Sequence, residues 1–405
     1  TVWSDWSEWP DDADTESNTV KVESKSQYRY SDKATTTSTN ASLPGWIQTG
    51  STTSYGGWGS WSVWQTNAIG GSDTRQVETA TVYPYYYFYL QMIGGVSLSM
   101  DQLRHFRDLY SAVQLAPKKT IAVAAAQDPD VLSAVSEACH IANASAILCG
   151  DRAKILSCAQ ACGADLSSCT IEEAPTPAEA AYSAVRLIQD GKADIIMKGM
   201  LDSSTFLKAI FARDSGIRIP GRVLSSIAVM DFAEQNRLLL ITDPGFVPYP
   251  DLEAKRQMLL NAVDVAQRLG ISVPKVAVLS ASETLNPKIV SSAEARLLQE
   301  MGERGELGAC QVAGPISLDL AISEMSARHK GYQHSVAGHA DILLTPNVES
   351  GNILYKSLTY FSHMETGGVV AGSAVPVVFT SRSDSPATKR NTILLAITLS
   401  QRSAS

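Results

Sequence analysis

Short apolar runs that alternate with longer amphipathic stretches constrain the fold of this chain more than any other feature. From residue 119 onward, most of these runs are continuously apolar, as in strands that helices cover on both faces. The repeated strand–helix order favours a largely parallel sheet with right-handed crossovers, and ligands of such sheets bind at the carboxyl ends of the strands. The expected strands are 120–125, 146–149, 195–197, 238–241, 276–279, 342–344 and 375–379.

Helical patterns fill segments between these runs, for example over residues 129–141, 177–188 and 252–269. The second pattern has a clear start signal, because Thr176 precedes a proline and Glu179 lies three residues further on. This spacing is typical of a capping box, in which each of the two side chains accepts a hydrogen bond from the other residue's backbone N–H. The sequence therefore predicts a helix that begins at the proline.

Several classes of protein find no support in this sequence. It contains no GxGxxG, GxxxxGK[ST] or GxSxG motif, which argues against a Rossmann dinucleotide enzyme, a P-loop NTPase and an α/β-hydrolase. The net charge of −8 argues against a nucleic-acid partner, which requires a basic face. Six cysteines without a CxxC pair or a metal-ligand spacing predict no metal site. Because there is no long apolar run and no signal-peptide pattern, we expect no membrane span and a cytoplasmic location for the part after residue 100.

The first part of the chain differs in composition from the rest. All seven tryptophans lie at or before Trp64, whereas every cysteine and histidine lies after residue 100. The string WSDWSEW at residues 3–9 returns as WGSWSVW at residues 58–64, an offset of 55, and similarity at a fixed offset indicates a repeat. The pattern resembles thrombospondin type-1-like repeats of bacterial surface proteins. We therefore expect a small β-rich or partly disordered repeat segment at 1–91 and a junction at 92–99.

Such a repeat would suggest a cell-surface location if it is native to the protein. A second hypothesis is that residues 1–99 come from a frame fusion and that Met100 is the natural start of the remaining part. The genomic DNA across this junction would decide between the two.

Three polar loops follow predicted strands and are candidates for a binding site. In the first, a strand leads to Lys198, the next residue permits close backbone approach, and two serines open a helix, which together would form a phosphate cradle. The loop contributes Lys198, Gly199, Ser203, Ser204 and Lys208. An ordinary helix cap with solvated lysines is the alternative.

The second and third loops follow the runs 342–344 and 375–379. The second combines short hydrogen-bonding side chains with a glycine, and a plain capped turn is its alternative. In the third, an arginine could hold phosphate with its planar fork while a serine or its backbone donates to an oxyanion. A surface loop is the alternative there. The residues are Asn347, Ser350, Gly351, Asn352 and Lys356 in the second loop, and Ser381, Arg382 and Asp384 in the third.

Several strings of this sequence also carry a family resemblance. The string ADIIMKG at 193–199 is similar to a signature of phosphate butyryltransferases, and LITD at 240–243, NAVD at 261–264 and TSRSDS at 380–385 match the same family. The matches run in order over roughly residues 100–400. This part of the chain therefore resembles the phosphate acetyl/butyryltransferase family, and most closely its butyryl branch.

The resemblance implies a two-lobed α/β/α fold, similar to isocitrate and isopropylmalate dehydrogenases, with the active site between the lobes. Lobe one would comprise residues 100–220 plus 371–405, and lobe two residues 221–370. Family members are homodimers or higher oligomers. The implied reaction is acyl-CoA plus phosphate giving acyl phosphate plus CoA, in bacterial short-chain acyl-CoA metabolism. It uses coenzyme A thioester as a substrate and requires no cofactor or metal.

The resemblance also implies residue roles. A Ser-Arg pair beside the thioester and phosphate matches Ser381 and Arg382, and a basic residue that binds anionic substrate matches Lys208. The position of a carboxylate proposed to deprotonate CoA falls on Thr388, which cannot act as a base, so Asp384 is the nearest candidate.

Other functions remain as alternatives to a phosphate butyryltransferase. A phosphate acetyltransferase would differ in the volume of the acyl pocket, which the sequence does not settle. A dehydrogenase of the shared fold should carry clustered metal-binding aspartates, and none are evident. A non-catalytic surface-repeat protein would have a functional first part and a degenerate remainder.

Overall fold

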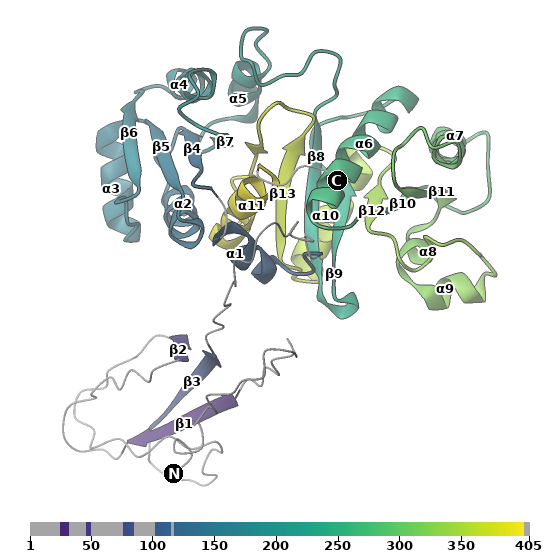
Figure 1. The fold of residues 1–405 in the computed structure, drawn as a ribbon, viewed down its shortest axis with the longest axis horizontal. Helices are drawn as coiled ribbons and strands as arrows, with labels where there is room; N and C mark the ends of the chain where they lie inside the picture. Colours follow the sequence, from purple (N-terminus) through teal and green to yellow (C-terminus); the bar gives the residue numbers. More distant parts are fainter. Residues whose placement is uncertain (1–24, 32–45, 50–75, 85–101, 115–116, 401–405) are drawn as a thin grey trace, which may run out of the picture. The chain divides into compact units, whose positions relative to one another are not determined.

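The computed structural model describes residues 25–31, 46–49, 76–84, 102–114 and 117–400. The chain divides into two compact units, Thr1–Leu98 and Ser99–Ser405. In the described part of the first unit, an antiparallel sheet has the strand order β1-β3-β2 (Figure 1). Its strands are β1 (Lys25–Ser31), β2 (Trp46–Thr49) and β3 (Gln76–Pro84). The two tryptophan strings of the predicted repeat lie outside the described residues.

The described part of the second unit contains one continuous sheet of eleven strands, in the order β11-β10-β12-β9-β8-β13-β14-β7-β4-β5-β6. A mixed α/β fold is therefore confirmed for this unit. The strands are β4 (Thr120–Ala124), β5 (Ser145–Gly150), β6 (Cys169–Glu173), β7 (Ile195–Lys198), β8 (Ser225–Phe232), β9 (Arg237–Thr242), β10 (Lys275–Leu279), β11 (Gln311–Ile316), β12 (Ile342–Leu344), β13 (Thr366–Ala371) and β14 (Val377–Val378).

The sheet is parallel at both ends and antiparallel in the middle. Strands β6, β5, β4, β7 and β14 are parallel to one another, and so are β11, β10, β12 and β9. Between these two groups, β8 pairs antiparallel with both β9 and β13, and β13 pairs antiparallel with β14. The predicted largely parallel sheet is thus confirmed, whereas the antiparallel middle was not predicted.

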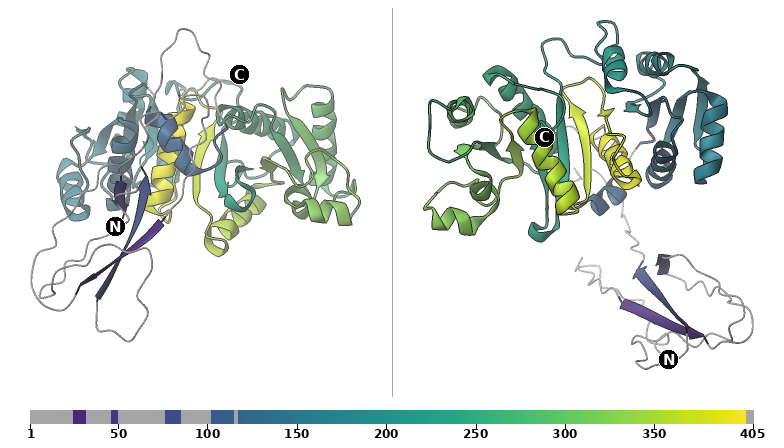
Figure 2. Two further views of the ribbon diagram at one scale, coloured as in Figure 1. Left: turned by 60° about the horizontal axis from the view of Figure 1, so that its bottom comes forward. Right: turned by 180° about the vertical axis from the view of Figure 1, so that it is seen from behind.

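Helices cover both faces of this sheet. Helix α6 lies in front of it in Figure 1, and α10 lies in front when the molecule is seen from behind in Figure 2. No helix within the described ranges has both the length and the apolar character needed to cross a lipid bilayer. The helices are α1 (Phe106–Gln114), α2 (Pro129–Ala142), α3 (Arg152–Cys162), α4 (Pro177–Gln189), α5 (Ser203–Ile210), the 3-10 turn η1 (Ala233–Gln235), α6 (Leu252–Arg268), α7 (Val290–Glu303), α8 (Leu318–Ile322), α9 (Glu324–His329), α10 (Val348–Phe361) and α11 (Pro386–Leu399).

The predicted start of α4 is confirmed in atomic detail. The Glu179 backbone N–H donates to the Thr176 hydroxyl at 3.2 Å, and the Thr176 backbone N–H donates to the Glu179 carboxylate at 3.0 Å. Pro177 occupies the first turn, where its missing N–H leaves no hydrogen bond unmade. Helices α2 and α6 also occupy the predicted segments.

Helix α11 lies deepest in the unit and orients the loop that precedes it. Every residue from Asn391 to Leu399 is buried, and the helix packs against α2, α1 and β13. A helix that is buried all round belongs to the core rather than to the surface. Its first turn, which contains Lys389, is thereby fixed beside the end of β14.

Candidate active site

Lys198 ends strand β7 as a buried lysine with no carboxylate partner at ion-pair distance among the described residues. Its ammonium group lies 5.6 Å from the ring centroid of Phe379, at the end of the neighbouring β14. Burial lowers the pKa of Lys198, and the nearby Arg382 guanidinium and Lys389 ammonium lower it further. The charges of Arg382 and Lys389, from the loop after β14 and the start of α11, thus act on Lys198, and the Asp202 and Asp384 carboxylates oppose their effect on its pKa. These three basic residues are called the cation cluster.

Gly199 allows the chain to leave β7 close to β4. A Cβ atom at this position would lie 2.4 Å from the Ala125 carbonyl oxygen and 2.6 Å from that of Ala124. The Gly199 N–H instead donates to the Ala124 carbonyl at 2.8 Å. Only glycine fits this approach, which delivers the chain to the start of α5 beside Lys198.

The start of α5 is a strongly capped helix N-terminus. Asp202 is the cap, and its carboxylate accepts from the Thr205 N–H at 2.8 Å and from the Ser204 hydroxyl at 2.5 Å. These hydrogen bonds hold the pKa of Asp202 well below its ordinary value. Ser203 is exposed in the first turn, and Lys208 is exposed in the last. Within residues 117–400, no hydrogen bond or ion pair joins Lys208 to Lys198, so its anion-binding role stays a prediction.

The loop after β14 forms a tight turn around Asp384. Its carboxylate accepts a hydrogen bond from the Ser381 N–H at 2.7 Å, and its own N–H donates to the Ser381 carbonyl at 3.2 Å. The hydroxyl oxygens of Ser381 and Ser383 are 3.0 Å apart. Arg382 is exposed and has no ion-pair partner among residues 117–400. The turn thus presents a serine hydroxyl and an available guanidinium together.

Lys389, in the first turn of α11, binds the backbone of this turn. It is 3% exposed, its ammonium group donates to the Asp384 carbonyl, and it lies 3.8 Å from the Asp130 carboxylate. Ser385 caps α11 by accepting from the Thr388 N–H at 3.1 Å. The turn is therefore held through its backbone on the side of α11.

The second predicted loop starts helix α10. Asn347 and Ser350 form a capping box, in which the Ser350 N–H donates to the Asn347 side chain at 2.9 Å. A Cβ atom on Gly351 would lie 2.4 Å from the Asp243 carbonyl oxygen. The Asn352 side chain donates to the Pro244 carbonyl at 2.9 Å. These contacts attach the N-terminus of α10 to the loop that follows β9.

Asp243 organises the loop after β9 from the inside. It is 1% exposed, and its carboxylate accepts from the N–H groups of Gly245 and Phe246 at 2.7 Å each and of Ser226 at 2.9 Å. Burial raises the pKa of Asp243 to about 6, although these hydrogen bonds oppose the rise. The carboxyl group therefore holds the loop as a rigid turn.

Three phenylalanines connect α5, the loop after β9 and the loop after β14. The Phe379 ring meets the Phe246 ring edge-on at 4.8 Å and the Phe206 ring, from α5, at 6.0 Å. Because Phe246 belongs to the turn bound by Asn352, these ring contacts link α10 to the loop that carries Arg382. The segments that contain Lys198, Asn352 and Arg382 are therefore connected.

Helix α10 approaches the same loop through Tyr355. Burial raises the pKa of Tyr355 to about 12, and the Asp384 carboxylate contributes to this rise. Lys356 lies 5.2 Å from the ring of Tyr355 and 5.9 Å from that of Tyr360, so its ammonium group is placed over aromatic faces. Asn347 and Ser350, by contrast, serve the helix cap.

Residue-by-residue inspection of the sequence missed the groups that hold the site together. These are Asp202, Asp243, Phe246, Phe379 and Lys389. Two signals were present: Asp243 lies directly after an apolar run and before Pro-Gly, and Lys389 lies in the first turn of a helix whose later residues are largely apolar. A charged group in either place needs a buried partner.

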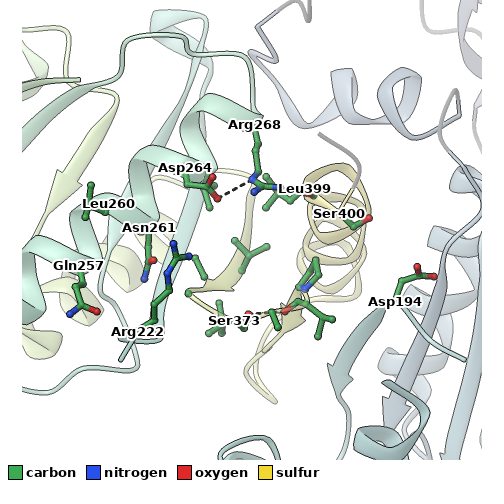
Figure 3. Close-up of a pocket in the computed structure, with 18 of the residues that line it drawn as sticks. Asp194, Arg222, Gln257, Leu260, Asn261, Asp264, Arg268, Ser373, Leu399 and Ser400 are labelled. Carbon is green, nitrogen blue, oxygen red and sulfur yellow. Dashed lines mark hydrogen bonds and ion pairs between the residues drawn. The ribbon is translucent and has the colours of Figure 1, made fainter. Parts of the chain in front are cut away.

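A cavity of about 800 Å³ lies elsewhere, between α6 and the turn that joins β13 to β14 (Figure 3). Arg222, Asn261 and Ser373 are among its lining residues, and no residue of the site described above belongs to them. Three of its cationic side chains already have carboxylate partners, in the pairs Arg268–Asp264, Lys119–Asp194 and Arg256–Glu253. The candidate active site is therefore the cation cluster and not this cavity.

Comparisons with known proteins agree with the arrangement. Residues 167–397 match the family described as "Phosphate acetyl/butaryl transferase". Phosphate butyryltransferase of Clostridium acetobutylicum is 43% identical over 294 residues, which cover 73% of this chain and 97% of that protein. Phosphate acetyltransferase of Thermotoga maritima is 37% identical over 278 residues, which cover 69% and 94%.

A solved structure also resembles this one. The branched-chain phosphotransacylase from Enterococcus faecalis superposes with a TM-score of 0.63 at 33% identity, covering 70% of this chain and 99% of that chain. The sequence matches span nearly the full length of these two relatives, and the family match falls on the unit that contains Lys198 and Arg382. This chain belongs to the phosphate acetyl/butyryltransferase family.

Proposed function

We propose that the second unit converts butyryl-CoA and phosphate into butyryl phosphate and CoA. Family membership supports the transfer of an acyl group between CoA and phosphate. Relatives at 41–44% identity are named as phosphate butyryltransferases or a probable one. Relatives named phosphate acetyltransferase are 35–40% identical, so acetyl-CoA is the alternative acyl donor.

The observation that carries this proposal is the buried ammonium group of Lys198, which donates to the Gly199 carbonyl at 3.4 Å and has no carboxylate at ion-pair distance within the described residues. A buried charge without a counter-ion is costly, so such a group needs an anionic partner. The nearby carboxylates of Asp202 and Asp384 already accept hydrogen bonds within their own turns. A phosphate ion would supply the missing negative charge, and Arg382 can hold two of its oxygens.

The proposed chemistry follows from this placement. A phosphate oxygen attacks the thioester carbonyl carbon, the carbonyl oxygen becomes an oxyanion, and the carbon–sulfur bond then breaks to release CoA thiolate. Lys198 and Arg382 orient the phosphate, and the Ser381 hydroxyl donates to the oxyanion. Asp384 positions Ser381 through the hydrogen bond it accepts from the Ser381 N–H. A thiol with a pKa of about 8.5 leaves readily near neutral pH, so the step requires little acid–base assistance.

We further propose two lobes and a homodimer or higher homo-oligomer. The lobes would comprise residues 100–220 plus 371–405 and residues 221–370, with the active site between them and the three cations on the first lobe. Among the side chains of α10, Ile353, Tyr360 and Phe361 are 67%, 55% and 85% exposed. Exposed apolar side chains gathered on one helix favour coverage by a second copy of the chain. Sedimentation of a Phe361→Glu variant would test this, and an unchanged oligomer size would contradict it.

The activity test uses the purified full chain with phosphate and butyryl-, propionyl- or acetyl-CoA. We expect thiol release, fastest with butyryl-CoA, and a fall of at least about tenfold in kcat/KM for Arg382→Ala. Arg296→Ala is the matched control, because the Arg296 guanidinium pairs with Glu300 at 2.9 Å on the surface of α7. Absence of thiol release from every acyl-CoA would overturn the proposal.

A further inference from the structure

An apolar surface adjoins the cation cluster. Phe206 is fully buried, whereas Phe246 and Phe379 are only partly buried although they pack against each other and against the core. Each of these two rings therefore keeps some surface that the protein does not cover. They come from distant segments, the loop after β9 and the end of β14.

The position of this surface relative to the cations is defined by Phe379. Its ring centroid lies 5.6 Å from the Lys198 ammonium group, and it precedes Ser381 by two residues. The same ring contacts Phe246 at 4.8 Å. The Phe379 ring thus contacts both the Lys198 ammonium group and the Phe246 ring, so the apolar surface directly adjoins the buried cation.

An apolar surface next to a buried cation matches an acyl group next to a phosphate. The inference therefore rests on the proposed function. In an acyl phosphate the carbonyl carbon is bonded to a phosphate oxygen, and the apolar chain begins at the next carbon. A site must therefore place apolar contacts close to its phosphate-binding cations. We propose that Phe246 and Phe379 form the wall that contacts the acyl chain, and that Phe246 sets the preferred chain length.

Phe246 is held firmly enough to discriminate between substrates. Its N–H donates to the buried Asp243 carboxylate at 2.7 Å, and the Asn352 side chain binds the Pro244 carbonyl two residues earlier. A wall that is fixed before the substrate arrives loses little entropy on binding and gives a defined pocket depth. Phe379 is fixed by Phe206 behind it and by the strand β14 before it.

The test compares kcat/KM for acetyl-, propionyl-, butyryl- and hexanoyl-CoA in the full chain. Each methylene that leaves water contributes roughly fourfold, so the two extra methylenes of butyryl-CoA are worth about fifteenfold. Phe246→Ala should lower the butyryl-to-acetyl ratio by about tenfold and raise the relative rate with hexanoyl-CoA. Phe246→Trp should disfavour hexanoyl-CoA further.

Phe211→Leu is the matched control, because Phe211 lies in an exposed position at the end of α5, outside the aromatic trio. Phe246→Leu is a milder variant that keeps the test decisive if Phe246→Ala fails to fold. Ratios equal to those of the unaltered chain in an active Phe246→Leu protein would overturn the inference. Failure of the unaltered chain to release thiol from any acyl-CoA would instead overturn the proposed function.

Discussion

The buried ammonium group of Lys389 donates a hydrogen bond to the backbone carbonyl of Asp384. The Asp384 carboxylate in turn accepts from the Ser381 N–H at 2.7 Å. Lys389, which lies outside the turn, therefore stabilises the turn that contains Ser381 and Arg382. Its own charge is balanced only by Asp130 at 3.8 Å within the described part of the chain.

Replacing Lys389 should disturb catalysis through the shape of this turn. Lys389→Met leaves the Asp384 carbonyl without its donor, and an unsatisfied buried acceptor costs about 1–3 kcal/mol. We expect kcat to fall by about tenfold or more, with partial recovery in Lys389→Arg, as measured by initial rates of thiol release. Lys192→Met is the control, since Lys192 is exposed and pairs with Asp190 near the end of α4. Equal activity in both variants would contradict a positioning role.

Replacing Lys198 should weaken the interaction with phosphate in particular. In Lys198→Met the side chain remains apolar and buried but loses its charge, so KM for phosphate should rise by at least about tenfold while KM for the acyl-CoA changes less. Because burial and Arg382 lower the pKa of Lys198, the protonated form should be lost at a lower pH than for an ordinary lysine. A pH profile of kcat/KM for phosphate checks this, and an alkaline limb that persists unchanged in the variant would argue against it.

Asp243 should make stability depend on pH in a recognisable direction. Its pKa in the folded chain is about 6, above the ordinary 3.8, so between these values the folded protein binds more protons than the unfolded chain. The free energy of unfolding therefore falls as pH rises through this window, by up to roughly 3 kcal/mol for a shift of about two pKa units.

The comparison with Asp243→Asn isolates this contribution. The advantage of the unaltered chain over the variant in urea unfolding should be largest near pH 4.5 and smaller near pH 7.5, because only the unaltered chain then buries a carboxylate. A difference that does not change with pH would show that this carboxyl group has no raised pKa.

Two glycines beside Asp243 provide a matched pair for testing packing. In Gly351→Ala the new methyl group would lie 2.4 Å from the Asp243 carbonyl oxygen and 2.8 Å from the Thr345 hydroxyl. We expect a loss of about 1–3 kcal/mol or more in the free energy of unfolding, since overpacking displaces the surrounding backbone. In Gly245→Ala the nearest atom is 4.0 Å away, so its unfolding midpoint should change little. Similar midpoints for both variants would rule out this close contact.

The sequence predicted those strands that are apolar along their whole length. It missed β8, although residues 227–230 are apolar, and it missed β6, β11 and β13 for reasons that the structure makes visible. Strand β6 is an edge strand with largely exposed side chains, and β11 is the other edge strand and contains a proline, which edge strands tolerate. Strand β13 contains two glycines, Gly367 and Gly368, which weaken a strand pattern. Periodicity alone therefore could not reveal the antiparallel middle of the sheet.

For the site, the sequence identified loops that carry Lys198, Asn352 and Arg382 but not the groups that bring these loops together. The joining contacts are made by Phe379 with Phe246, and by the Asp243 carboxylate with the Ser226 N–H. Such contacts join segments that are far apart in sequence, so no local spacing encodes them.

The antiparallel pairing of β13 with both β8 and β14 has a mechanical consequence. Together with the pairing of β8 with β9, it joins the two parallel groups of strands through backbone hydrogen bonds in the middle of the sheet. Any change in the angle between these two groups must therefore be distributed over many backbone torsions of β8 and β13. This favours small movements within the sheet over a large rotation about a single hinge.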